Sequence, residues 1–172
     1  MNTVYIGGAG VVSSLGAGLA ATERALRENR SAIRPLTVFA LLQGTPLPVG
    51  QVDGLDNVGA DPSLPRTHRL ALLAAREAMT GAVAPPDAIV IGTTTGGIAV
   101  TEQLLRDGER DKQRYRYHGL GTVARTLAEE YNCTGPALTV STACSSGVVA
   151  IAVAMAMLRS GTAKTVLVGG VD

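Results

Sequence analysis

The last third of the chain limits the possible folds most strongly, because a helix without a polar side stands there between two short apolar strands. Residues 137–141 and 165–168 are predicted strands, and residues 144–159 are the predicted helix. A helix that is apolar all round needs packing partners on every side. Two strands joined through a helix run parallel in one sheet. The chain is therefore predicted to be α/β, with a mainly parallel sheet, helices on its faces, and this helix buried in the middle.

The upstream residues repeat the alternation of strands and helices. Strands are predicted at 4–6 and 88–91, and helices at 18–29, 67–79, 98–106 and 121–131. Prolines and glycines scattered over 31–65 predict loops with short extended pieces. On helix 67–79 the periodicity predicts an inward side and an outward side; the inward residues are Leu70, Leu73 and Ala74, and the outward residues are Arg69, Arg76 and Glu77.

Composition and charge exclude several classes of protein. The net charge of +1 creates no strong field for nucleic acid or an anionic membrane. The first residues lack the basic stretch of a secretory signal, and the longest unbroken apolar run, Val148–Leu158, is about half of what a bilayer requires. Cys133 and Cys144 make neither a disulfide framework nor a metal site. We expect one cytoplasmic domain over residues 1–172, without a metal, a cofactor, nucleic acid or a membrane partner.

Cys144 stands where the predicted strand 137–141 turns into the following helix. The first amides of a helix lack intrahelical partners and carry the positive end of the helix dipole. They stabilise a thiolate, which is the nucleophilic form, and the oxyanion formed when a thioester carbonyl is attacked. Ala143, Ser145 and Gly147 are the residues expected to support this turn and leave room for a substrate. The alternative from local physics is a small, buried structural cysteine.

The motif around this cysteine resembles the active-site signature of the β-ketoacyl synthases, also called the β-ketoacyl-ACP synthase family. It comprises Thr142-Ala143-Cys144-Ser145-Ser146-Gly147, an alanine-rich helix, Arg159-Ser160-Gly161 and Val168-Gly169-Gly170. Residues 8–16, 32–36, 92–97 and 135–136 resemble further blocks of the family in the same order. The resemblance covers essentially all 172 residues.

The resemblance implies the N-terminal half of a thiolase-like fold, with the C-terminal half absent from residues 1–172. Cys144 would accept an acyl chain as a thioester, and malonyl-ACP would then condense with it and lose CO2. The acyl carrier protein (ACP) is the implied partner, and no cofactor is implied. The two active-site histidines of the family lie in the second half. His68 and His118 do not match them, and we expect His68 to be exposed or to cap its helix.

A lone half is expected to leave one sheet face and the cysteine helix exposed as an apolar patch. A complementary C-terminal half, or a homodimer partner, would cover it. The chain is accordingly interpreted as a fragment or as one product of a split enzyme.

Two other functions stay open at this point. One is a non-catalytic scaffold or regulatory half-subunit, and the other is a different thiolase-like cysteine acyltransferase. The pathway also stays open between fatty acids, polyketides and polyenes. The glycines near residue 8 lack the third glycine and the acidic residue of a dinucleotide site. The basic and aromatic run 110–117 is interpreted as a solvated loop or subunit contact, with docking of the acidic carrier protein as a second hypothesis.

Overall fold

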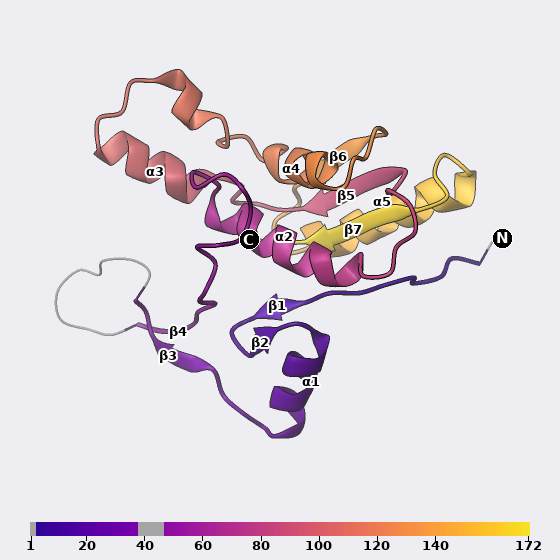
Figure 1. The fold of residues 1–172 in the computed structure, drawn as a ribbon, viewed down its shortest axis with the longest axis horizontal. Helices are drawn as coiled ribbons and strands as arrows, with labels where there is room; N and C mark the ends of the chain where they lie inside the picture. Colours follow the sequence, from indigo (N-terminus) through magenta and orange to yellow (C-terminus); the bar gives the residue numbers. More distant parts are fainter. Residues whose placement is uncertain (1–2, 38–46) are drawn as a thin grey trace.

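The computed structural model describes residues 3–37 and 47–172 (Figure 1). Its helices are α1 Leu19–Arg27, α2 Arg66–Ala78, α3 Ile98–Arg106, α4 Thr122–Glu130 and α5 Ser146–Ser160, with a short 3-10 helix, η1, at Lys112–Tyr115. Its strands are β1 Val12–Ser13, β2 Gly16–Ala17, β3 Ile33–Pro35, β4 Pro48–Gly50, β5 Ala88–Gly92, β6 Ala137–Val140 and β7 Val166–Gly170. All five predicted helices are confirmed, each to within two residues of its predicted bounds.

The sheet that carries the fold has three parallel strands in the order β6-β5-β7. The register places Gly92 of β5 beside Val140 of β6 and Gly170 of β7, so the carboxyl ends of the three strands meet at one edge. β5 lies in the middle and is buried along its whole length. The predicted parallel sheet is confirmed.

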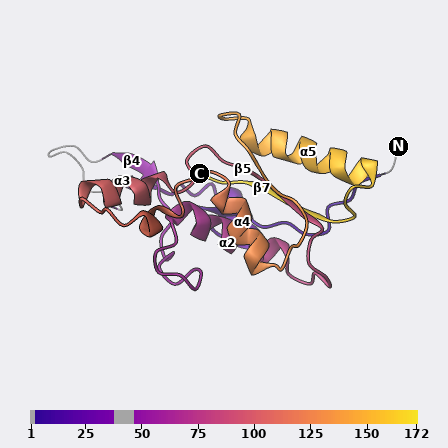
Figure 2. The same ribbon diagram turned by 90° about the horizontal axis from the view of Figure 1, so that it is seen from above.

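Helices cover both faces of this sheet, because successive side chains of a strand point to opposite faces. Ile89 and Ile91 pack with Leu72 of α2 and Leu127 of α4. Val90, between them, packs against α5. Figure 2 shows the resulting three layers, with α5 on one side of the sheet and α2 and α4 on the other. The predicted exposure of one sheet face is therefore wrong for β5, although Leu138 of β6 stays 40% exposed.

The predicted strand at 4–6 does not form. Those residues pair with no strand in the described part of the chain, and Tyr5 and Ile6 are 84% and 89% exposed. Instead β1 pairs with β2, and β3 pairs with β4, as two short antiparallel hairpins. The expectation of short extended pieces in 31–65 is thus confirmed for its described residues, while 38–46 lie outside them. An apolar alternation near a terminus predicts a strand only where a partner strand is available.

Two predictions on α2 are wrong, because the buried side of the helix includes His68 and Arg69. The guanidinium of Arg69 donates hydrogen bonds to a ring of backbone carbonyls in the 55–64 segment, which wraps over this side of α2; they belong to Leu55, Asp56, Val58, Asp61, Pro62 and Leu64. Leu70, Leu73 and Ala74 are only partly buried. A prediction from helical periodicity assigns an arginine to the solvent side of a helix. A buried guanidinium is stable, however, where backbone carbonyl oxygens accept its hydrogen bonds.

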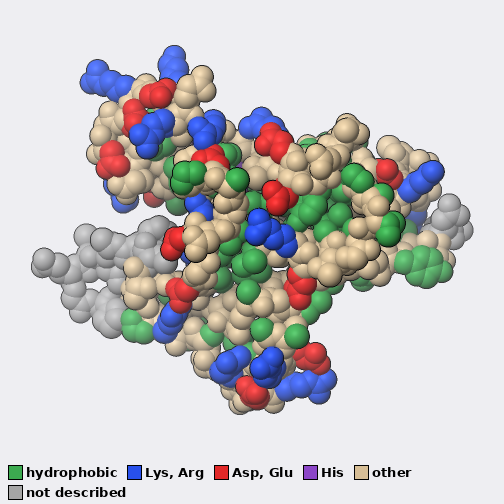
Figure 3. All heavy atoms as spheres, in the orientation of Figure 1, with side chains coloured by type: hydrophobic (Ala, Val, Ile, Leu, Met, Phe, Trp, Pro, Cys, Tyr) green, Lys and Arg blue, Asp and Glu red, His purple; other side chains and the backbone are tan. Residues whose placement is uncertain are grey.

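Helix α5 is packed on one side only, contrary to the prediction of packing all round. Ala150 and Ala154 lie against the sheet and are almost fully buried, whereas Val148 is 72% exposed and Ile151 is 48% exposed. The expected exposure of the cysteine helix is thereby confirmed. On the opposite face, Figure 3 shows hydrophobic side chains reaching the surface across the middle of the molecule.

Within the described residues, the segment Ala143–Ser160 is long and apolar enough, by length and composition alone, to cross a membrane. A core helix passes the same test. The alanines of α5 pack on a parallel sheet, so we interpret α5 as a core helix with one uncovered side.

Candidate active site

Cys144 lies at the carboxyl edge of the sheet, in the turn that joins β6 to α5. Its side chain is exposed. The side chain is thus not buried within the described residues, unlike that of the small, buried structural cysteine considered as the alternative. Cys133 is partly buried and packs against the main core, as expected of a structural residue. Parallel α/β sheets place ligands outside the carboxyl ends of their strands, which is where Cys144 lies.

The turn that presents Cys144 is strained. Ala143 has a φ of 53°, a left-handed conformation that costs a residue with a Cβ about 1–2 kcal/mol. The Ser146 hydroxyl holds the turn closed, because it accepts a hydrogen bond from the Thr142 amide at 2.9 Å and donates one to the Ala143 carbonyl at 2.7 Å. The Ser145 hydroxyl donates to the Thr142 carbonyl at 2.8 Å. The predicted support by Ala143 and Ser145 thus corresponds to direct contacts within the turn.

Three glycines bring the start of α5 unusually close to the strand ends. A Cβ on Gly92 would lie 2.4 Å from the carbonyl carbon and oxygen of Ser146. A Cβ on Gly170 would lie 3.1 Å from the Cα of Gly147, and one on Gly147 would lie 3.6 Å from the Cα of Gly170. Side chains at these positions would push the helix away from β5 and β7. The position of Cys144 therefore depends on glycines in three separate elements.

A carboxylate closes the same edge of the sheet. Asp172, which follows β7, accepts hydrogen bonds from the turn after β5; the donors are the hydroxyls of Thr93, Thr94 and Thr95 and the amides of Thr94 and Thr95, at 2.7–3.0 Å. Burial by itself would raise the pKa of Asp172, but the hydrogen bonds from the Thr94 amide and hydroxyl and from the Thr95 amide lower it to about 2. The carboxylate is therefore ionised at neutral pH.

The two histidines have other partners. His68 Nε2 lies 2.8 Å from the Thr122 hydroxyl, and the imidazole ring packs edge-on against Tyr117 at 5.1 Å between centroids. Burial, with a smaller effect from Arg125, lowers the pKa of His68 to about 4, so this ring is neutral at neutral pH. His118 Nδ1 lies 3.2 Å from the Thr101 hydroxyl. Neither ring hydrogen-bonds to the 142–147 turn.

The charged run at 110–117 is only partly a solvated loop. Arg114 pairs with Glu109 at 3.1 Å, and Arg116 pairs with Asp61 at 2.5 Å. The Tyr117 hydroxyl also donates to Asp61, at 2.6 Å. The two contacts with Asp61 tie the run to the loop that precedes α2.

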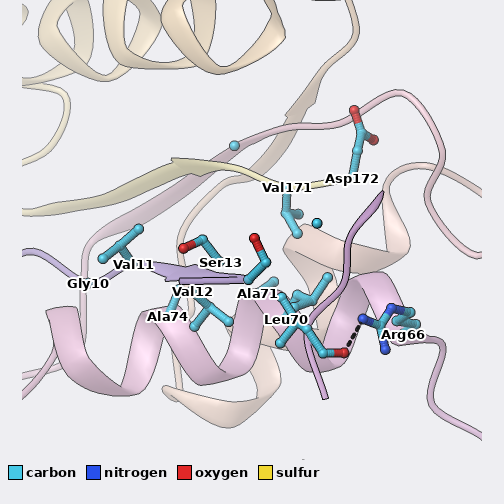
Figure 4. Close-up of a pocket in the computed structure, with 14 residues that line it drawn as sticks. Gly10, Val11, Val12, Ser13, Arg66, Leu70, Ala71, Ala74, Val171 and Asp172 are labelled. Carbon is cyan, nitrogen blue, oxygen red and sulfur yellow. Dashed lines mark hydrogen bonds between the residues drawn. The ribbon is translucent and has the colours of Figure 1, made fainter. Parts of the chain in front are cut away.

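A cavity of about 490 Å³ lies between residues 10–14, α2 and the end of β7 (Figure 4). Val11, Leu70 and Ala74 line it, and Val171 and Asp172 close one end. Cys144 does not line this cavity. Within the described residues, no three His, Cys, Asp or Glu side chains come close enough together to hold a metal ion.

Sequence reasoning located the cysteine, Ala143, Ser145 and Gly147, but it missed Ser146, Gly92 and Asp172. A serine at the start of a helix is a recognisable signal of a hydroxyl that bonds to nearby backbone. Glycines that end two neighbouring strands likewise signal a close approach of another backbone. No local signal connects Asp172 with residues 93–95, which precede it by 77–79 positions.

The fold belongs to a known class. The ishigamide ketosynthase/chain length factor structure superposes with a TM-score of 0.79 at 27% identity, covering 97% of this chain and 46% of that one. A second structure holds a type II polyketide synthase acyl carrier protein in complex with its ketosynthase bound to the hexaketide; it superposes with a TM-score of 0.76 at 23% identity, covering 96% of this chain and 44% of that one. The class is that of the thiolase-like ketosynthases, and the chain has the N-terminal half of their fold.

The family follows from the sequence match. The model of the β-ketoacyl synthase N-terminal domain matches residues 1–172, and the chain belongs to the β-ketoacyl synthase family. A curated relative, the tetracenomycin polyketide synthase ketoacyl synthase alpha subunit of Streptomyces glaucescens, is 28% identical over 98% of this chain. The chain spans 45% of the length of that relative.

Proposed function

We propose that the protein is a ketosynthase of a polyketide pathway and that Cys144 is its acyl-accepting nucleophile. The observation that carries the proposal is an exposed cysteine on a strained turn at the carboxyl edge of a parallel sheet. A structural cysteine needs neither exposure nor a turn that is held against strain. Membership of the β-ketoacyl synthase family favours this role over that of a scaffold subunit.

The proposed reaction has two stages. In the first, the Cys144 thiolate attacks the thioester carbonyl of an acyl-ACP, and the carrier thiolate leaves with the electron pair of the broken C–S bond. In the second, malonyl-ACP loses CO2, and the carbanion that remains attacks the acyl-Cys144 carbonyl and expels the Cys144 thiolate. The product is a 3-oxoacyl-ACP that is two carbons longer.

The residues of this chain account for the first stage. The turn held by Ser145 and Ser146 leaves Cys144 exposed. The Ser145 and Ser146 amides donate to the Thr142 and Ala143 carbonyls, so a developing oxyanion would have to bond to another amide of the turn. His68 is buried and neutral, and its hydrogen-bond partner is Thr122 rather than a residue of the turn. The decarboxylation histidines are therefore proposed to come from a C-terminal half.

The proposed partners follow from the same comparison. The exposed side of α5 and the unpaired residues 4–6 are apolar surfaces that a complementary half or a second copy would cover. One similar structure is a ketosynthase/chain length factor, which supports a subunit partner of this kind. An acyl carrier protein delivering acyl and malonyl groups, and a cytoplasmic location, complete the proposal. Because matched relatives are named as polyketide synthases, a polyketide pathway is favoured over fatty acid synthesis.

Acyl transfer to Cys144 is the direct test. The protein is mixed with octanoyl-ACP, and the acylated residue is identified by mass spectrometry of its peptides. We expect acylation at Cys144 and not at Cys133, which is partly buried. A Cys144→Ala variant should lose the label, and a Cys133→Ala variant should keep it.

The outcomes separate the candidate functions. Loss of the label in Cys144→Ala alone supports the ketosynthase. Acylation from octanoyl-CoA but not from octanoyl-ACP would indicate a different thiolase-like acyltransferase. The absence of acylation from both donors, with the complementary half present, would replace the enzyme with the scaffold.

A further inference from the structure

We propose that His68 and Arg69, neighbours on α2, make two surface segments open together as one unit when His68 takes up a proton. One segment is the Arg69 loop, residues 55–64, whose carbonyls surround the guanidinium of Arg69. The other is the α3–η1 arm, residues 97–121, in which α3 and η1 extend beyond the sheet (Figure 1). This device is independent of the role proposed for Cys144.

His68 ties α2 to the end of the arm. Its side chain is fully buried, and Nε2 lies 2.8 Å from the Thr122 hydroxyl. That hydroxyl donates its single proton to a backbone carbonyl, at 2.6 Å for Gly119, so Nε2 is the donor and Nδ1 is the unprotonated nitrogen. Nδ1 has no hydrogen-bond partner in the described part of the chain. A proton that binds there therefore creates a buried cation without an acceptor.

The groups that face the ring give this cation no support. Tyr117 packs edge-on against the ring at 5.1 Å between centroids, and its hydroxyl donates to Asp61. Arg125 of α4 adds a repulsive positive charge. Burial, with this smaller effect of Arg125, lowers the pKa of His68 to about 4, against 6.5 for an exposed ring. As the pH falls below 6.5, a conformation that exposes the ring binds the proton first, so acid favours opening.

Asp61 joins the arm to the Arg69 loop. Its carboxylate accepts hydrogen bonds from the Tyr117 hydroxyl at 2.6 Å and from the Arg116 guanidinium at 2.5 Å. The backbone carbonyls on either side of Asp61 bond to Arg69, which follows His68 on α2. The contacts thus form a closed circuit from α2 through the arm, Asp61 and the loop back to α2. Because Asp61 is shared, displacement of Tyr117 from His68 also loosens the loop.

The two ends of the arm lie against each other. A Cβ on Gly97, at the start of the arm, would lie 2.0 Å from the carbonyl oxygen of Tyr117, near its end. The Thr101 hydroxyl, in the first turn of α3, lies 3.2 Å from His118 Nδ1. Movement of Tyr117 therefore reaches both ends of the arm, and we expect the arm to open as a whole.

Native-state hydrogen exchange of the full chain tests the device, because it measures the opening of individual amides. The Leu64 amide, which donates to Asp61, reports on the loop, and the Thr101 amide, which donates to Gly97, reports on the arm. After correction for intrinsic rates, both should exchange about tenfold faster at about pH 5 than at pH 6.5. The Ile89 amide of β5 reports on opening of the sheet and should stay slower than both at each pH.

Three variants test the parts of the circuit. His68→Gln should abolish the acid response of both segments. His118→Gln is the matched control, because it removes the other histidine of the chain, which is exposed, and the response should remain. Arg116→Leu/Tyr117→Phe removes both bonds to Asp61 but keeps an aromatic ring against His68. In this double variant the Thr101 amide should keep its acid response, and the Leu64 amide should lose it.

Each outcome bears on the proposal. An acid response that persists in His68→Gln, or that disappears in His118→Gln, overturns it. A loop that still responds in the double variant also overturns it, because Asp61 then does not carry the coupling. If Thr101 and Leu64 exchange no faster than Ile89, the segments open only with the whole protein and the device does not exist. If His68→Gln does not fold, the wild type and the double variant decide the question by the same two amides.

Discussion

The Ser146 hydroxyl is the part of the site whose loss can be followed most directly, because it holds the strained turn through two hydrogen bonds. The side chain is 4% exposed, so water cannot replace it. In Ser146→Ala the Thr142 amide loses its acceptor, while the Ala143 carbonyl keeps the hydrogen bond from the Ser146 amide at 3.0 Å. The substitution therefore leaves the Ala143 carbonyl with another donor but leaves the Thr142 amide without its acceptor.

The magnitude follows from these two terms. A buried donor left without a partner costs about 1–3 kcal/mol. Relaxation of Ala143 out of its left-handed conformation returns part of the about 1–2 kcal/mol of strain. The free energy of unfolding should therefore fall by about 1–2 kcal/mol. Because a relaxed turn no longer holds Cys144 in one direction, the rate of its acylation should fall by about tenfold or more.

Two measurements check this prediction. Urea denaturation should give a lower midpoint with an unchanged slope, and mass spectrometry should give the acylation rate of Cys144. Ser145→Ala is the matched control: Ser145 is exposed and donates to the Thr142 carbonyl, so its loss should cost under about 1 kcal/mol. A Ser146→Ala protein as stable and as quickly acylated as the wild type, or a larger effect in Ser145→Ala, would refute the reasoning.

Three further substitutions test the surrounding structure. The pKa of His68 is about 4 in the folded protein and near 6.5 when unfolded, so the unfolded chain binds the extra proton between these values. The free energy of unfolding should thus fall by about 3 kcal/mol from pH 6.5 to 4. In His68→Gln the urea midpoint should depend less on pH in this window, and a pH dependence equal to that of the wild type would contradict the assignment. Arg69→Lys should cost about 2–4 kcal/mol, since an ammonium cannot reach the carbonyl ring; unchanged hydrogen exchange in 55–64 would argue against that role. In Gly92→Ala the acylation of Cys144 should be slow even if the melting temperature changes little, because the added Cβ would lie 2.4 Å from the carbonyl carbon and oxygen of Ser146. An acylation rate equal to that of the wild type would show that α5 can shift without harm.

The local elements of this protein were predictable because their signals are local. Apolar runs bounded by glycine or proline predicted β5, β6 and β7; periodicity supported α2, and a long unbroken apolar run predicted α5. Gly161, a residue type that commonly ends a helix, follows α5 with a left-handed φ of 74°. Cys144 could be singled out because a strand that turns into a helix presents its first residues to solvent. These features depend on neighbours within a few positions.

Other features depended on what lies opposite in space. Arg69 and His68 were predicted to be outside, yet segment 55–64 covers Arg69 with carbonyls and Tyr117 and Thr122 enclose His68. The apolar residues 4–6 make no strand, since a strand needs a partner.

The sequence by itself determined the five helices, the three parallel strands β5, β6 and β7, and the choice of Cys144 as the proposed nucleophile, because backbone geometry and side-chain patterns act over short distances. Only the tertiary structure decided which side of α5 is covered, how closely Gly92 approaches Ser146, and that Asp172 holds the 93–95 turn. The physical reason is that hydrogen bonds and close packing between distant segments exist only after the chain has folded, so no local pattern records them.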